Sequence, residues 1–82
     1  MKDQLSVIAI MVDNRDEMAP EVQEIITRHG RDIISRLGVP SASKEQGLIT
    51  LIYEGKSDEA VKFRRQLEEI PGTNVQMINF PN

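Results

Sequence analysis

His29 is the side chain in this sequence best suited to acid–base chemistry or metal binding. It is the only histidine among 82 residues, cysteine is absent, and imidazole titrates near neutral pH. His29 also ends an apolar stripe and precedes Gly30, a position where histidine packs well and complements a helix dipole. A structural role is therefore the preferred interpretation. A small enzyme that uses His29 with Glu24 or Asp32 is kept as an alternative.

No other set of residues forms a catalytic or cofactor-binding motif. The serines lack the surroundings of a nucleophile elbow, and Ser57 is explained as the N-cap of a helix. The glycines stand at the ends of expected elements and form neither a G-x-G-x-x-G nor a P-loop sequence. One histidine without thiolates supplies too few ligands for zinc. We therefore predict a protein that is not an enzyme and holds neither metal nor cofactor.

Two polar segments could border a ligand. Arg28, Arg31 and Arg36 surround the junction between an expected helix and the following strand, where they could meet an anion or a neighbouring carboxylate. Residues 13–17 join an expected strand to that helix, and loops in this position often carry binding groups. Solvated charge is the simpler interpretation of both segments.

The composition argues against several partners. The 13 acidic and 10 basic residues are interspersed and give a net charge of -3, which does not favour direct contact with nucleic acid. The longest apolar run, residues 7–12, is too short to span a bilayer, and the first residues lack the layout of a secretory signal. We expect a cytoplasmic protein without membrane contacts.

The length predicts one domain over residues 1–82. A domain of this size buries only about 60–65% of the surface of its unfolded chain, so its stability is marginal. Disulfides and structural zinc are excluded by the missing cysteines. Oligomerisation is therefore the most available source of additional burial.

The pattern of apolar residues predicts alternating strands and helices. Residues 5–12 read LSVIAIMV, a β-branched run typical of a strand. Pro20 suits the first turn of a helix, which an apolar stripe continues to His29. The complete expectation is strands over residues 5–12, 32–37, 47–54 and 75–80, helices over 20–29 and 58–69, and a polar loop over 41–46.

This order predicts an α+β, ferredoxin-like βαββαβ fold, in which two helices cover one face of a four-stranded antiparallel sheet. The first and third strands are nevertheless apolar on both faces. One set must face away from the helices, and a one-residue shift in register exchanges the two sets. The candidates for the outward set include Ile8, Ile10, Ile49 and Leu51. Because an exposed apolar patch marks an interface, we expect a homodimer or a dimer of dimers.

The chain resembles a known family along nearly its whole length. The segments that carry the resemblance are SVIAIMVDNRDEMAPEVQEII, HGRDIISRLGVP and GLITLIYEGKSDEAVKFRRQLEEIPGTNVQ, with Ile34, Arg36, Gly38 and Pro40 among their most specific residues. They are similar to the iron-only hydrogenase system regulators, small bacterial proteins that look like a stand-alone ACT-like domain. The family is similar in fold to the C-terminal ligand domain of the nickel-responsive repressor.

The resemblance implies a regulatory or effector-sensing role in anaerobic hydrogen metabolism. The histidines and cysteine that bind nickel in the repressor have no counterparts here, so we expect no nickel site. ACT-like domains place effectors between subunits, which implies a ligand near Asn14, Arg15, Arg36 and Gly38. The alternative is a structural module that binds a protein partner without a small-molecule ligand.

Overall fold

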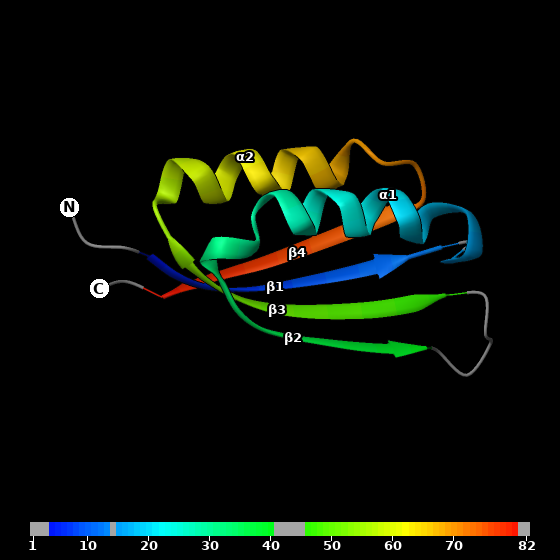
Figure 1. Cartoon of the computed structure of the whole chain (residues 1–82), viewed down its shortest axis with the longest axis horizontal. Helices are drawn as coiled ribbons and strands as arrows, with labels where there is room; N and C mark the ends of the chain where they lie inside the picture. The colour runs from blue at the N-terminus through cyan, green and yellow to red at the C-terminus, as the bar shows by residue number, and fades with distance from the viewer. Residues whose placement is uncertain (1–3, 14, 41–45, 81–82) are drawn as a thin grey trace.

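The computed structural model describes residues 4–13, 15–40 and 46–80, and the side chains of residues 15–18 and 40 lie outside this description. Figure 1 shows the elements in the order β1, α1, β2, β3, α2, β4. Their bounds are β1 (Gln4–Val12), α1 (Arg15–Arg28), β2 (Ile33–Pro40), β3 (Gly47–Gly55), α2 (Ser57–Glu68) and β4 (Thr73–Phe80), with a short 3₁₀ helix, η1 (Gly30–Asp32), before β2.

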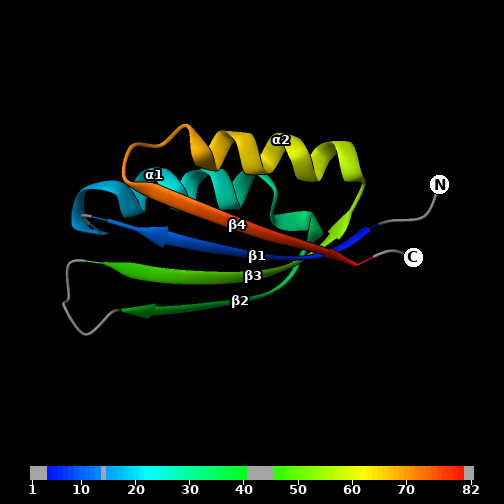
Figure 2. The ribbon, with the colours of Figure 1, turned by 180° about the vertical axis from the view of Figure 1, so that it is seen from behind.

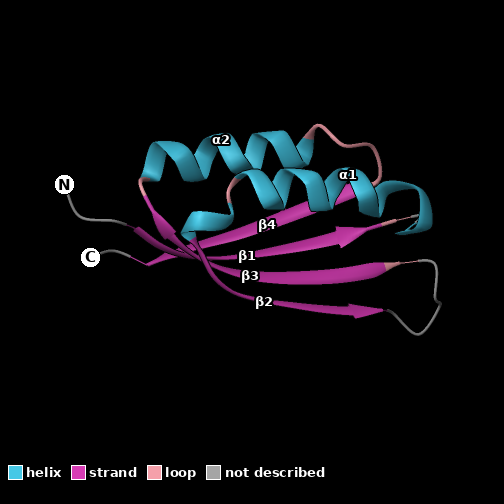
Figure 3. Cartoon of the chain, in the orientation of Figure 1, coloured by secondary structure: helices cyan, strands magenta, loops and turns pink. Residues whose placement is uncertain are grey.

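The strands form one antiparallel sheet in the order β2-β3-β1-β4. Figures 2 and 3 show α1 and α2 side by side on the same face of this sheet. The predicted ferredoxin-like arrangement is confirmed. Neither helix in the part of the chain that is described has the length and apolar character needed to cross a membrane.

The core lies between the helices and the two central strands. Ile8 pairs with Leu51 and Ile10 with Ile49, and all four side chains are buried beneath the helices. Burying an aliphatic or aromatic side chain stabilises a fold by roughly 1.5–3 kcal/mol. The helices contribute Val22, Ile25, Ile26, Ala60, Phe63 and Leu67 to this core.

The opposite face of the sheet, which we call the open sheet face, is apolar and uncovered. It carries Leu5, Val7, Met11 and Ile52, which are half-buried, and Leu37, Val39, Leu48, Ile78 and Phe80, which are exposed. The candidates named from the sequence for the outward set, Ile8, Ile10, Ile49 and Leu51, are therefore wrong, because they fill the core. The register of β1 on β3 decides this assignment.

Two helix starts differ from the sequence prediction. Helix α1 begins at Arg15 and contains Pro20 in its interior, whereas the predicted helix began at the proline. Helix α2 begins at Ser57, and its N-cap is Lys56, whose side chain makes no capping hydrogen bond. The expected capping role of Ser57 is therefore wrong. In α2, Asp58 and Glu59 complement the dipole within the first turn.

The second strand begins one residue later than the predicted range 32–37 and continues three residues beyond it. Asp32 closes η1, and β2 runs from Ile33 to Pro40 with an irregularity in register between Ile33 and Ser35. The shift places Arg36 and Gly38 opposite Leu51 and Ile49, on the side of the sheet that faces the helices. Of the predicted polar loop, residues 41–45 lie outside the described residues.

Candidate functional site

A groove runs between α1 and the β2 side of the sheet. One part of it is a hollow of about 220 Å³ lined by Ala19 and Gln23 of α1, Gly38 of β2 and Ile49 of β3, among others. A Cβ atom added at Gly38 would meet nothing within 4 Å, so the glycine leaves open space there. The lining is mainly apolar, with the Gln23 amide as a polar group.

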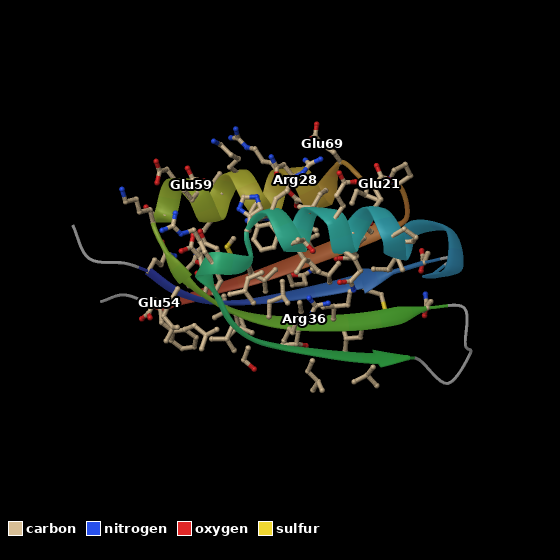
Figure 4. The ribbon with its side chains drawn as sticks, viewed as in Figure 1. Glu21, Arg28, Arg36, Glu54, Glu59 and Glu69 are labelled. Carbon is tan, nitrogen blue, oxygen red and sulfur yellow. The ribbon has the colours of Figure 1, made fainter. Side chains whose placement is uncertain are left out.

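A neighbouring hollow of about 370 Å³ continues the groove toward the C-terminal end of α1. Ile26 and Thr27 line it from the helix, and Ile33 and Arg36 line it from β2. The Arg36 guanidinium donates a hydrogen bond to the Gln23 side-chain carbonyl, so this contact lies between the two hollows. We call the two hollows together the α1–β2 groove; Figure 4 labels Arg36 on its β2 side.

The residues expected to bind a ligand are partly assembled at this groove. Arg36 and Gly38 lie two residues apart on the same face of β2 and line adjoining hollows. Arg15 is the first residue of α1, but its side chain lies outside the described residues. Asn14 lies outside them entirely. Their part in a ligand site therefore stays a prediction.

Sequence reasoning missed Gln23 and Ala19, which form the helical wall of the groove. Both lie on α1 with a spacing of i and i+4, and such residues share one side of a helix. The sequence offered one signal for this wall. Gln23 follows the small Ala19 by four positions, and both lie beside the buried stripe that includes Val22 and Ile26. This signal has low specificity, because amides are common on the flanks of helices.

The loops beyond the groove are tied together at the same end of the domain. The Asp13 backbone N–H donates to the Gly72 carbonyl at 2.8 Å, and the Gln46 amide donates to the Asp13 carboxylate at 2.6 Å. Gly72 has a φ of 80°, a left-handed conformation that favours glycine. These contacts fix the exit of β1, the segment that leads toward Asn14 and Arg15.

His29 has a packing role in the structure. Its ring stacks on Phe63 with centroids 4.4 Å apart, and its Nε2 shares a hydrogen bond of 2.9 Å with the Gln66 side chain. Phe63 and Gln66 both belong to α2, so His29 joins the end of α1 to the second helix. Within residues 4–13, 15–40 and 46–80, no three histidine or acidic side chains are grouped as a metal site.

Comparisons with known structures agree on the fold. The structure of TM1266 from Thermotoga maritima superposes with a TM-score of 0.91 at 21% identity, covering 98% of this chain and 100% of the other. The ACT domain of GTP pyrophosphokinase from Chlorobium tepidum gives a TM-score of 0.77 at 18% identity, covering 93% and 99%.

A more distant similarity is to CPII, a nitrogen regulatory PII-like protein from Thiomonas intermedia bound to ADP, AMP and bicarbonate. It has a TM-score of 0.53 and 13% identity, covering 96% of this chain and 94% of the other. No curated protein matches the sequence. The family model for TM1266-like proteins matches residues 4–77, which is most of the chain. The chain therefore belongs to the TM1266-like family of iron-only hydrogenase system regulators.

Proposed function

We propose that this protein is a small, cytoplasmic, effector-sensing ACT-like module that regulates an iron-only hydrogenase system. The observation that carries the proposal is the family match over residues 4–77. The α1–β2 groove supports the sensing part, because small-molecule sites are concave, mostly apolar and equipped with a few polar groups. The effector would contact Arg36, Gly38 and the segment carrying Asn14 and Arg15.

The active form in this proposal is a homodimer or a dimer of dimers. The open sheet face supports it, because Leu37, Ile78 and Phe80 expose 64%, 58% and 49% of their surfaces on a layer that no helix covers. A specific interface buries about 800 Å² on each partner. Joining two such faces would also supply the burial that a small domain lacks.

A second candidate function is a protein-binding structural module that needs no effector. The same open sheet face favours it, since an apolar surface accepts a different protein as readily as a second copy. The two candidates differ in their response to small molecules. We expect the regulatory module to gain thermal stability with at least one compound in a panel of amino acids and nucleotides, because ligands that bind only the folded state stabilise it.

The effector test uses purified protein and two sets of substitutions. For any stabilising compound, replacing Arg15 and Arg36 together with glutamine removes the charges proposed to hold it. Affinity should fall about ten-fold or more, since hydrogen bonds to charged groups contribute about 1.5–3 kcal/mol. Arg65→Gln is the matched control, because Arg65 is an exposed residue of α2 away from the groove. An unchanged affinity in the double variant would place the ligand elsewhere.

The regulatory part is tested in cells. Deletion of the gene should change the transcription or activity of the iron-only hydrogenase, and the wild-type gene should restore it. His29→Ala tests the enzymatic alternative: we expect it to complement the deletion wherever the variant protein accumulates, because the imidazole serves packing against Phe63. Loss of complementation by a stable His29→Ala protein would favour the enzyme.

A further inference from the structure

A second cavity, which we call the end cavity, lies where α1 ends and α2 begins. Its volume is about 480 Å³, and it is lined by Arg28 of α1, Asp32 of η1, Gly55 at the end of β3 and Glu59 of α2, together with His29, Arg31 and Lys56. Figure 4 labels Arg28 and Glu59 on the two helices. This end of the domain is opposite the end that carries the exit of β1 and the start of β3 (Figure 1).

The cavity combines cations and carboxylates. Arg28 pairs with Glu24 at 2.9 Å, and Glu59 lies 3.8 Å from Lys62 in a loose ion pair. Among the described residues, Arg31, Lys56 and Asp32 take part in no ion pair. Arg31, Lys56 and Asp32 thus line the cavity without an ion-pair partner among the described residues.

Helix α2 begins next to the cavity, which Lys56 and Glu59 line from this side. Its N-cap, Lys56, supplies no side-chain cap, and the Asp58 carboxylate accepts a hydrogen bond from the Glu59 N–H at 3.0 Å. The first N–H groups of a helix have no partners within the helix and favour a negative group. Lys56 precedes this helix start and lines the cavity, and Asp58 and Glu59 follow it in the first turn.

A buried hydroxyl lies behind the cavity lining, next to Gly55 and Asp32. The Tyr53 side chain is fully buried, and its hydroxyl faces the Asp32 carboxylate, although no hydrogen bond of normal geometry joins them in the described structure. A Cβ atom at Gly55 would stand 2.9 Å from this hydroxyl and 3.0 Å from Cγ of Asp32. A side chain at residue 55 would therefore collide with both the Tyr53 hydroxyl and the Asp32 carboxylate. A buried polar group of this kind normally has a partner.

From these groups we propose that the end cavity is a second ligand site, for a small organic anion that also carries an amine. Arg31, Lys56 and the first N–H groups of α2 would bind the phosphate or carboxylate of the ligand. Asp32 would accept a hydrogen bond from its amine, and the buried Tyr53 hydroxyl behind Asp32 would help to position that carboxylate. The volume lies within the range of about 300–1,000 Å³ that holds small-molecule ligands. Amino acids and adenine nucleotides share this chemistry.

The experiment is an amide-resolved NMR titration of the full chain with four probes at millimolar concentration. Glutamate and AMP each carry an anion and an amine, whereas inorganic phosphate and adenosine carry only one of the two groups. We expect glutamate or AMP to move the Gly55, Lys56 and Ser57 resonances and to bind more tightly than either single-group probe. Comparing glutamate with AMP shows whether the cavity prefers an amino acid or an adenine nucleotide.

Substitutions then test the assigned contacts. Arg31→Gln together with Lys56→Gln should weaken binding of the active probe about ten-fold or more, since each change removes a hydrogen bond to a charged group. Tyr53→Phe keeps the ring and removes the hydroxyl, and it should weaken binding without unfolding the protein. Arg65→Gln again serves as the control, because it removes an exposed α2 charge outside the cavity.

The end-cavity proposal fails if neither glutamate nor AMP perturbs these resonances, or if binding is the same in the double variant as in the wild type. Binding by phosphate as tight as by AMP would also overturn it, because Asp32 would then have no role. The α1–β2 groove is separate, and a ligand there would move Gly38 and Val39 instead. Failure of either site thus leaves the other intact.

Discussion

The buried hydroxyls of Ser6 and Tyr53 differ in their hydrogen bonding. The Ser6 hydroxyl, on the helix side of β1, donates to the Asn79 side chain at 2.7 Å. The hydroxyls of Tyr53 and Thr73 make no hydrogen bond of normal geometry in the described structure. A buried polar group without a partner costs about 1–3 kcal/mol. The Asp32 carboxylate next to Tyr53 reduces this cost for the protonated phenol and opposes its ionisation.

The Tyr53 hydroxyl fits where it does because residue 55 is a glycine. Gly55→Ala would place a Cβ 2.9 Å from the Tyr53 hydroxyl, so the ring or the strand must move. We expect a loss of about 1–3 kcal/mol in the free energy of unfolding, measured by urea denaturation. Gly38→Ala is the control, because its Cβ meets nothing within 4 Å and alanine suits a strand better than glycine. Equal stability of the two variants would contradict the close packing.

Alkaline pH provides a second test of Tyr53. Burial raises the pKa of Tyr53 from 10.0 to about 12, and the charges of Asp32 and Glu59 act in the same direction. Between these values the unfolded chain loses the phenolic proton while the folded chain keeps it, so stability falls as the pH rises. The effect is about 1.4 kcal/mol for each unit separating the two pKa values. Below pH 10 the phenol is protonated in both states, so it does not make the free energy of unfolding depend on pH.

The measurement compares urea unfolding of the wild type and Tyr53→Phe across this range. The difference between them isolates the phenol, because lysines titrate in both proteins. Tyr53 is the only tyrosine, so its ionisation is also visible directly in ultraviolet absorbance. Parallel pH profiles for the two proteins would show that the phenol titrates alike in the folded and unfolded chains.

At the scale of single elements, Pro20 distinguishes the predicted helix from the observed one. The sequence places proline in the first turn, where its missing N–H costs nothing. In the structure α1 begins five residues earlier, so Pro20 removes a hydrogen bond that would reach the Asp16 carbonyl. Proline in a helix interior costs about 3 kcal/mol relative to alanine.

Pro20→Ala should therefore raise the free energy of unfolding, by up to about 3 kcal/mol, together with helical circular dichroism. Ala19→Gly is a useful companion, since it should lower stability by about 1 kcal/mol if residue 19 is inside a helix. No gain in stability or helicity on removing the proline would favour a helix that starts at residue 20.

Strand and helix types were predictable here because the apolar periods are distinct. The β-branched run of β1 and the stripe that includes Phe63 and Leu67 in α2 specify their elements locally. The start of α1 was not predictable, because it places a proline inside a helix, against the usual preference. The extension of β2 to Pro40 was not predictable, because it depends on pairing with β3, a separate segment of the chain.

Some residues of the candidate site could likewise be named from the sequence, and others could not. Arg36 and Gly38 could be named from the sequence because they lie in a recognisable segment at the end of a strand, and β2 brings both to the groove, but their binding role stays a prediction. Gln23 was missed, because its contact with Arg36 joins residues on different elements. The end cavity likewise gathers side chains from two helices, η1 and the end of β3, a set with no common sequence pattern.

At the scale of the whole molecule, the open sheet face predicts the assembly. Leu37 and Ile78 lie on the edge strands β2 and β4, and lysine is well tolerated on edge strands. Leu37→Lys with Ile78→Lys should yield a folded monomer of 9.3 kDa, whereas the wild type should run as a dimer or larger species. Light scattering coupled to size exclusion at micromolar concentration measures both masses.

Val61→Lys is the matched control for this experiment. Val61 is an apolar residue with 47% of its surface exposed, but it lies on α2 in the other layer. We expect this variant to keep the wild-type mass. A monomeric wild type, or dissociation by Val61→Lys alone, would show that the sheet face is not the interface.

The central place of β1 also has a consequence for synthesis on the ribosome. β1 pairs only with β3 and β4, which start at Gly47 and Thr73, so the earliest strand gains its neighbours last. Pairing between such distant segments slows folding, and an unpaired strand with two apolar faces aggregates readily. The nascent chain therefore exposes the apolar side chains of β1 until β3 has left the exit tunnel.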